Sequence, residues 1–425
     1  MRGLPQAPCH LTSVPLLPNI PRLLDELAHL ATISAHPAPA VTRVLFSEED
    51  LTARAWLLTL AENAGLRTRS DSIGNLFITL PGSDPSLPAV ATGSHTDAIP
   101  NAGAYDGVVG VLGGLEALRS IAESGETPRR SIELIMFTAE EPTRFGIGCL
   151  GSRMMAGTIT ADEARQLRDP NGISLEQLRP PQYSGDLAAT RLTPGSYSHF
   201  IELHIEQGPH LEAAGIDIGL VEKIAAPAAF RLTFTGTGGH AGAVLMPGRH
   251  DAFLAAAETA LAVETAALES GSPDTVGTTG VIEVKPGAIN SIPCHALMEI
   301  DFRDTDLAAR DAALIRIRQS AETICERRGV QLDWFLINSD PPALCSQEIL
   351  AVAETHTTDL SYTSTRLISR AYHDSLFMAR LCPTAMIFIP CLNGWSHRPD
   401  EFSSPQAIAK GTTLLAHTLL TLAAS

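Results

Sequence analysis

The chain has 425 residues, of which 44% are hydrophobic, and it carries a formal net charge of −17. This length exceeds what one hydrophobic core usually serves, so we expect two domains, one of them inserted in the other. The strong negative charge argues against nucleic acid or an anionic membrane surface as a partner. No uninterrupted apolar run reaches membrane-spanning length, which favours a soluble globular protein.

The cysteines and the amino-terminal segment bear on the compartment. The seven cysteines form no CxxC pair, which is typical of reduced thiols in a cytosolic protein. Prolines at positions 5, 8, 15 and 18 predict that the first 20 or so residues are loosely ordered. This segment also lacks a clean apolar signal core, so we expect a cytoplasmic location.

In chain order, the first half alternates between helices and strands. The second helix opens with Ser47 and Asp50 in a capping-box-like pattern. Residues 131–138 are almost continuously apolar, as a central strand would be. The predicted elements are helices at 22–31, 47–65 and 108–121, and strands at 75–80, 88–92, 131–138 and 200–205.

From about Ala214 the pattern changes to the order β-α-β-β-α-β, the signature of a small ferredoxin-like sheet with two helices on one face. Its elements are a strand at 230–237, a helix at 251–269, strands at 278–284 and 296–302, a helix at 307–328 and a strand at 330–336. A helix at 348–359, a strand at 384–389 and a helix from Pro405 follow. We therefore predict a domain at 214–338 inserted in a domain made of 1–213 and 339–425.

The segment Gly93–Gly107, GSHTDAIPNAGAYDG, lies between a predicted buried strand and a predicted helix. Open α/β sheets build their sites in loops at the carboxyl ends of strands. This segment holds His95, Asp97 and Asp106, and such mixed ligands suit zinc, manganese or nickel better than calcium. The alternative is a polar turn in which Asp106 caps the following helix.

Candidate metal ligands follow the ends of several predicted strands of the same domain. Each alone is more often structural, but their common placement favours two metal ions bridged by a carboxylate, which fits hydrolysis. The five candidates are His95, Asp106, Glu141, His204 and His397.

Glu140 stands next to Glu141 where a predicted strand ends. Adjacent residues leaving a strand point in different directions, so one can bind metal while the other moves a proton. The alternative is an exposed acidic pair at the start of a helix. Asp97, two residues after His95, is placed to accept the second imidazole N–H and so fix the tautomer.

Co-linear motifs from about Ser47 to the C-terminus resemble the dinuclear-metal amidohydrolases of the M20 peptidase superfamily, and within it the hydantoinase/carbamoylase branch. The motifs are GSHTDAIPNAGAYDGVVGVLGGLEAL, FTAEEPTRFGIGCLGSR, ELHIEQGP, GGHAGAVLMPGRHDA, NSIPCHALMEIDFRD, YHD and WSHRPDEF. The resemblance implies a zinc-exopeptidase-like α/β catalytic domain with an inserted ferredoxin-like α+β lid domain that forms a homodimer. It also implies two divalent metal ions per subunit and favours Mn²⁺, with Zn²⁺, Co²⁺ or Ni²⁺ as alternatives.

The resemblance assigns roles to the candidate residues. It implies one metal ion on His95, Asp106 and His204, and the other on Asp106, Glu141 and His397. It makes Glu140 the general base and acid, gives Asp97 the role of orienting His95, and lets His240 of the lid reach the neighbouring subunit's site. Judged by its neighbours alone, His240 is a histidine in a tight turn.

The resemblance also implies how an anionic substrate is held. Asn290 and Arg303 match lid residues that bind its carboxylate, and Gln207 and His373 match further substrate-facing positions. A guanidinium binds a carboxylate bidentately even in an acidic protein. The alternative for Arg303 is a surface ion pair with the aspartates at 301 and 304.

Within the branch, several motifs look most like the ureidoglycolate amidohydrolases. Tyr372 stands where carbamoylases usually have glycine, and we expect it to leave a small polar pocket. The expected reaction is cleavage of (S)-ureidoglycolate to glyoxylate, ammonia and carbon dioxide in purine and allantoin nitrogen catabolism. The alternatives are an N-carbamoyl-L-amino acid or allantoate as substrate, a peptidase, or a catalytically idle dimer that metal merely stabilises.

Overall fold

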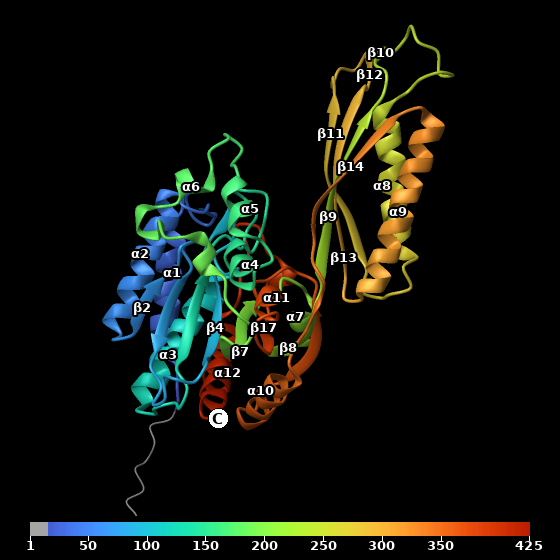
Figure 1. Cartoon of the computed structure of the whole chain (residues 1–425). Coiled ribbons are helices and arrows are strands. Elements are labelled where there is room, and N and C mark those ends of the chain that lie inside the picture. Colours follow the sequence, from blue (N-terminus) through green and yellow to red (C-terminus); the bar gives the residue numbers. More distant parts are fainter. Residues whose placement is uncertain (1–15) are drawn as a thin grey trace, which may run out of the picture. The chain divides into compact units, whose positions relative to one another are not determined.

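The computed structural model describes residues 16–425 (Figure 1). The predicted loose order of the amino terminus falls mostly on residues 1–15, which lie outside the described part. The chain forms two compact units: unit 1 holds the residues up to Glu222 with Cys345–Leu367 and His373–Ser425, and unit 2 holds Lys223–Leu344 with Ile368–Tyr372. Within the described residues, no helix combines the length and apolar character needed to cross a membrane.

The largest sheet has the strand order β15-β8-β17-β7-β4-β6-β3-β2, and β16 pairs with β8. Its four central strands, β17, β7, β4 and β6, run parallel, so their carboxyl ends meet at one edge. The strands are β2 (Arg67–Ser70), β3 (Leu76–Leu80), β4 (Ala89–His95), β6 (Ile132–Phe137), β7 (Tyr197–Ile205), β8 (Ile218–Ile224), β15 (Ala343–Leu344), β16 (Ser364–Ser369) and β17 (Thr384–Ile389).

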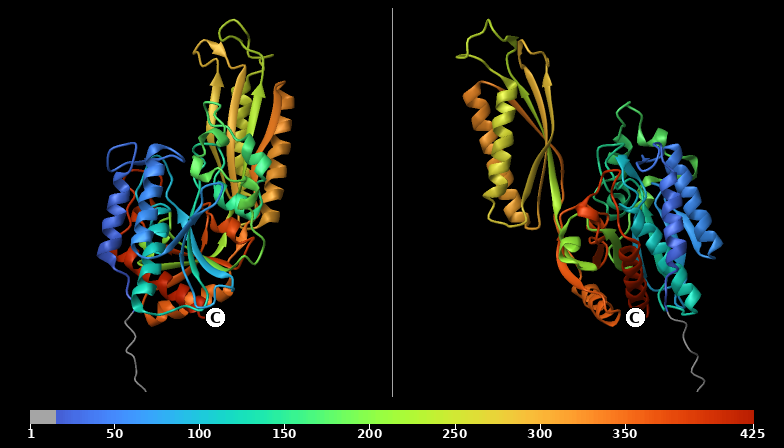
Figure 2. Two further views of the ribbon diagram at one scale, coloured as in Figure 1. Left: turned by 60° about the vertical axis from the view of Figure 1, so that its left-hand side comes forward. Right: turned by 180° about the vertical axis from the view of Figure 1, so that it is seen from behind.

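Helices cover both faces of this sheet (Figure 2). Leu134 of β6 lies beside Gly114 of α3, whereas Phe137 packs on the other face with Met155 of α4 and Met378 of α11. This α/β architecture agrees with the prediction. The helices are α1 (Ile20–Thr32), α2 (Glu48–Asn63), α3 (Val108–Ser124), α4 (Leu150–Ala156), α5 (Ala161–Gln166), α6 (Leu175–Leu178), α7 (His210–Ala214), α10 (Gln347–Asp359), α11 (Ser375–Met378) and α12 (Pro405–Ala423).

Unit 2 contains an antiparallel sheet of order β11-β13-β9-β14, and α8 and α9 lie side by side on one of its faces (Figure 1). The predicted β-α-β-β-α-β order is confirmed, whereas the lid role of residues 214–338 stays a prediction. The elements are β9 (Ala226–Thr235), β10 (Gly239–His240), α8 (Ala252–Leu268), β11 (Val276–Lys285), β12 (Ser291–Ile292), β13 (His295–Asp304), α9 (Leu307–Arg328) and β14 (Gln331–Ser339).

The segment Gly93–Gly107 is more ordered than a loop. Strand β4 continues through His95 because it pairs with β6 up to Phe137. Residues Ala98–Ala102 form a further strand, β5, which pairs with β1 (Val41–Arg43). The sequence AIPNA conceals this strand because proline and asparagine are depleted in strands.

Candidate active site

The parallel strands deliver polar side chains to one edge of the sheet. His95 is the last residue of β4, Glu140 and Glu141 follow β6, and His204 lies near the end of β7. His397 follows β17. Among residues 16–425, three groups each bring ligand atoms within 4.8 Å of one another: His95, Asp106 and His204; Asp106, Glu141 and His397; and Glu202, His204 and His373. The first two contain all five predicted metal ligands.

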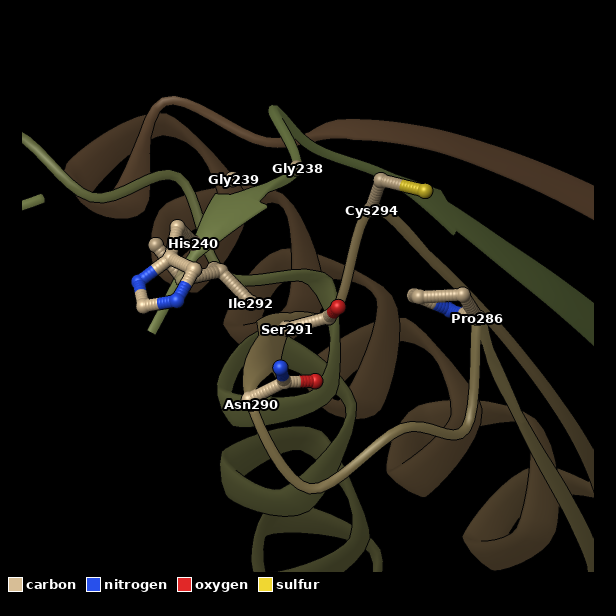
Figure 3. A pocket seen from close by; sticks show the side chains of 8 residues that line it. All are labelled: Gly238, Gly239, His240, Pro286, Asn290, Ser291, Ile292 and Cys294. Atoms are coloured by element: carbon tan, nitrogen blue, oxygen red, sulfur yellow. The ribbon is translucent and has the colours of Figure 1, made fainter. Parts of the chain in front are cut away.

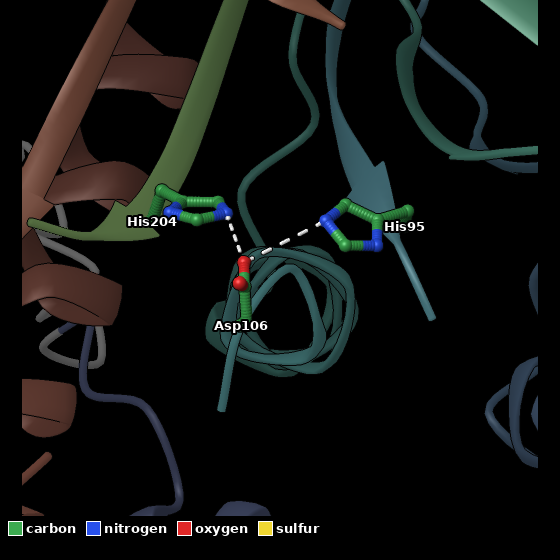
Figure 4. A group of neighbouring side chains, drawn as sticks. All are labelled: His95, Asp106 and His204. Carbon is green, nitrogen blue, oxygen red and sulfur yellow. Dashed lines mark ion pairs between the residues drawn. The ribbon is translucent and has the colours of Figure 1, made fainter. Parts of the chain in front are cut away.

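Asp106 lies at the centre of this site. Its Oδ1 is 3.0 Å from His204 Nε2 and 3.7 Å from His95 Nε2 (Figure 4). Its Oδ2 is 3.1 Å from His397 Nε2, which is 3.4 Å from Glu141 Oε1. Each carboxylate oxygen of Asp106 therefore faces a different set of ligands, as a carboxylate that bridges two cations would.

The side chain of Asp106 is not a helix cap. Gly107 is the N-cap of α3 and makes no side-chain capping bond, so the polar-turn alternative is wrong. Asp106 Oδ2 instead accepts hydrogen bonds of 2.8 Å from Gln207 Nε2 and of 2.8 Å from Ser396 Oγ. The Asp106 amide donates to Glu401. Sequence reasoning passed over Ser396 and Glu401, although both lie in the motif WSHRPDEF.

Gly107 makes room for the first imidazole. Its φ is +66°, and a Cβ at this position would lie 2.4 Å from atoms of the His95 ring. Any other residue would therefore be strained in backbone and would displace the ring.

Asp97 connects three site residues. Its Oδ1 accepts from the Glu140 amide at 3.3 Å, and its Oδ2 accepts from the Glu141 amide at 3.0 Å. His95 Nδ1 lies 3.0 Å from the Asp97 carbonyl oxygen and 3.7 Å from its carboxylate, so the main chain is the nearer acceptor. Glu140 and Glu141 are 8% and 5% exposed, so the alternative of an exposed acidic pair is wrong.

The site concentrates negative charge away from water. Burial and the charge of Glu141 raise the pKa of Glu140 well above its ordinary value, and burial and the charge of Asp106 raise the pKa of Glu141 to about 8. Burial lowers the pKa of His204, but its hydrogen bond with Asp106 outweighs this and raises it to about 9. Burial lowers the pKa of His95 to about 4, so its imidazole is neutral and able to bind metal. Closely spaced carboxylates beside a neutral imidazole fit a site for divalent cations.

The third group, Glu202, His204 and His373, is better explained by structural hydrogen bonds of Glu202 than by a metal site. Glu202 Oε1 accepts from Ser94 Oγ at 2.8 Å, and Oε2 accepts from Ser375 Oγ at 2.6 Å and from its amide. Both oxygens are therefore occupied. The bonds connect Ser94, Glu202 and Ser375, which lie one or two residues from His95, His204 and His373. A glutamate between Ile201 and Leu203 in an apolar strand is a signal that sequence reasoning overlooked.

The remaining predicted residues divide between the units. His373 packs against His204 in unit 1, with ring centroids 4.6 Å apart. His240 and Asn290 are exposed in unit 2 and line a pocket of about 340 Å³ (Figure 3). The pocket residues are Gly238, Gly239, His240, Pro286, Asn290, Ser291, Ile292 and Cys294.

Arg303 and Tyr372 have partners within unit 2. Arg303 pairs bidentately with Asp301 at 2.7 and 2.8 Å, so the alternative ion pair is present. The Tyr372 hydroxyl donates to Asp340 Oδ2 at 2.8 Å. A substrate carboxylate would have to share Arg303 with Asp301 or displace it.

Arg303 and Asn290 lie at opposite ends of β13. Arg303 is near the end of this strand, whereas Asn290 precedes its first residue, His295. The eight steps between His295 and Arg303 span about 27 Å at strand geometry. The expectation that Asn290 and Arg303 hold one small carboxylate fails for residues of the same subunit.

Known proteins are similar in sequence to this chain along almost its whole length. Ureidoglycolate hydrolase of Arabidopsis thaliana is 51% identical over 412 residues, which are 95% of this chain and 87% of the relative. N-carbamoyl-L-amino acid amidohydrolase of Geobacillus stearothermophilus is 38% identical over 95% of this chain and 98% of the relative.

Solved structures agree over almost the whole chain. The crystal structure of AtUAH in complex with (S)-hydroxyglycine matches with a TM-score of 0.89 at 49% identity, over 96% of this chain and 98% of that one. A hydantoinase/carbamoylase family amidase from Burkholderia vietnamiensis matches with a TM-score of 0.90 at 32% identity, over 97% and 99% of the two chains. The sequence model of Peptidase family M20/M25/M40 matches residues 91–421, and the chain belongs to this family.

Proposed function

We propose that the protein is a dinuclear-metal amidohydrolase that cleaves the ureido group of (S)-ureidoglycolate. The observation that carries the proposal is Asp106, whose two oxygens face two different ligand sets beside the buried Glu140. The choice of substrate follows the relatives from Arabidopsis and rice, both 51% identical and named ureidoglycolate hydrolase.

Two divalent cations fit the donor set, one on His95, Asp106 and His204 and the other on Asp106, Glu141 and His397. When bound, such ions polarise a carbonyl oxygen and lower the pKa of water. We propose Mn²⁺ as the native metal, in line with the resemblance. The mixed imidazole and carboxylate ligands also accept Zn²⁺, Co²⁺ or Ni²⁺.

Glu140 serves as general base and acid. Its Oε2 lies 3.7 Å from His95 Nε2, so it faces the first ligand set, and it is almost fully buried. It takes a proton from the water that attacks the ureido carbon and returns the proton to the leaving nitrogen. Carbamate then decays to carbon dioxide and ammonia, and the hydroxyglycine left behind decays to glyoxylate and a second ammonia.

A homodimer explains how Arg303 and Asn290, at opposite ends of β13, can serve one site. Because β13 separates Arg303 from Asn290, we assign them to different subunits of one site. Arg303 binds the substrate carboxylate in its own subunit, and Asn290 and His240 of the partner subunit act at the ureido group. Gln207 and His373 contact the substrate in unit 1, and Tyr372 limits its size. This role for Tyr372 requires its hydroxyl to leave or share Asp340.

We also propose that the reaction belongs to purine and allantoin nitrogen catabolism, because it releases nitrogen from a ureido acid as ammonia, and that the protein is cytoplasmic. The second candidate substrate is an N-carbamoyl-L-amino acid, because a relative of that name is 38% identical. Both candidates present a ureido carbonyl near a carboxylate.

A substrate panel tests the proposal. Metal-free protein reloaded with Mn²⁺ is assayed for ammonia release from both ureidoglycolate enantiomers, allantoate and several N-carbamoyl-L-amino acids. We expect (S)-ureidoglycolate to give the highest kcat/KM and the metal-free protein to be inactive. A higher kcat/KM on any other member of the panel would overturn the assigned substrate, and full activity without metal would overturn the mechanism.

A further inference from the structure

Arg43 is a fully buried cation that bonds main-chain carbonyl oxygens. It is 0% exposed, and it forms no ion pair with any residue from 16 onward that the structure describes. Its Nη1 donates to the Thr96 carbonyl at 2.6 Å, and its Nη2 donates to the carbonyls of Leu30 and Ile33 at 2.6 and 2.9 Å. Burying an unpaired charge is costly, so its place calls for a physical reason.

One reason is the end of α1. Leu30 lies in the last turn of this helix and Ile33 is its C-cap residue, so the guanidinium meets carbonyls at the negative end of the helix dipole. Burial lowers the pKa of Arg43 to about 10, which leaves it charged at neutral pH. The helix end thus compensates part of the cost of the buried charge.

The second reason is that Arg43 contacts the turn that contains Asp97. Thr96 and Asp97 are the two residues between β4 and β5. The Arg43 side chain holds Thr96 before Asp97, and its backbone pairs with Ala98 after Asp97. One residue therefore fixes both sides of Asp97.

Any shift of this turn would reach the reacting groups. The Asp97 carboxylate accepts the amides of Glu140 and Glu141, and its carbonyl faces His95 Nδ1. Arg43 Nη1 thus bonds the carbonyl of Thr96, whose carbon is bonded covalently to the Asp97 nitrogen. Asp97 in turn holds the proposed base and two proposed metal ligands.

We propose that Arg43 is a positioning residue, which clamps the Thr96–Ala98 turn so that Asp97 sets the places of His95, Glu140 and Glu141. The proposal rests on the proposed function for the roles of these three residues. The clamp itself is a property of the metal-free chain, so it can be tested without turnover.

The test compares Arg43→Met and Arg43→Lys with Leu23→Ala, a control in the buried face of α1 about two turns before Leu30. Amide hydrogen exchange at Glu140 and Glu141 is measured in the metal-free proteins, and the dissociation constant for Mn²⁺ is measured by chelator competition. For Arg43→Met we expect exchange at least ~10-fold faster and Mn²⁺ binding about 10-fold weaker, as for other groups that support metal ligands. Leu23→Ala should lower Tm but change neither measurement.

Arg43→Lys keeps the charge but presents a single ammonium in place of the planar group that meets three carbonyls. We expect it to fall between wild type and Arg43→Met, and it remains available if Arg43→Met does not fold. Exchange and Mn²⁺ affinity equal to the Leu23→Ala control would overturn the clamp, as would an Arg43→Lys protein equal to wild type. Failure of the wild type to bind Mn²⁺ would count against the proposed function, and the exchange measurement would still decide the clamp.

Discussion

The two units place their proposed functional residues differently. Unit 1 buries Arg43, Glu202 and Asp374 completely, close to a site whose acidic residues are almost fully buried. Unit 2 has an apolar core between its sheet and helices, and its proposed functional residues His240 and Asn290 are exposed. Buried charge is expensive unless it is compensated, so unit 1 holds its chemistry in place before any substrate arrives. The exposed His240 and Asn290 of unit 2, by contrast, can act only on a ligand or a second subunit that comes into contact with them.

The largest effect is expected inside unit 1. Glu140→Gln removes the proton acceptor while keeping the shape of the side chain, and we expect kcat to fall about 10³-fold. Mn²⁺ content, measured by elemental analysis, should stay near that of wild type. Glu133→Gln is the matched control, a buried glutamate on β6 that bonds Arg69, Thr79 and Tyr197 instead. Retained turnover in Glu140→Gln would remove its assigned role.

In unit 2, Arg303→Met should reduce kcat/KM about 100-fold, because a charged partner of the substrate is lost. Arg231→Met removes a comparable pair with Glu299 on the same sheet and should be nearly neutral. The assay is steady-state ammonia release.

Mixing the Arg303→Met and His240→Ala proteins tests whether these two residues of unit 2 belong to different subunits of one site. If the two residues serve one site from different subunits, a heterodimer contains one intact site. Random reassociation then restores about a quarter of wild-type activity. No recovery, in a mixture shown to exchange subunits, would place both residues in the same subunit's site.

The smallest effect is a pH dependence of unit 1 without metal. The pKa of His204 is raised to about 9, so the stabilisation from its protonated form is complete below 6.5 and lost as the pH rises through 9. The pKa of Glu141 is raised to about 8, so its ionisation also removes stability as the pH rises from 4.5 to 8. We expect the Tm of the metal-free protein to fall from pH 7 to pH 9, and Mn²⁺ to reduce this fall. A metal-free Tm that is constant or rises over this range would contradict these shifts.

Much of unit 1 could be predicted because parallel strands bring their carboxyl ends together. Apolar runs mark the strands, so the residues after them, such as His95 and Glu141, can be assigned to one edge without coordinates. The contacts of Arg43 could not be predicted this way, since its acceptors are main-chain carbonyls that any residue could supply. The separation of Asn290 from Arg303 was also missed, although the strand predicted at 296–302 already places the two residues beyond its opposite ends.

The close fit of Gly107 against the His95 ring has a consequence for protein engineering. A position where one added carbon would strike an imidazole cannot be randomised without losing the centre that performs the reaction. Libraries that seek new substrates should therefore leave this turn unchanged and vary Tyr372, which is proposed to limit the size of the substrate.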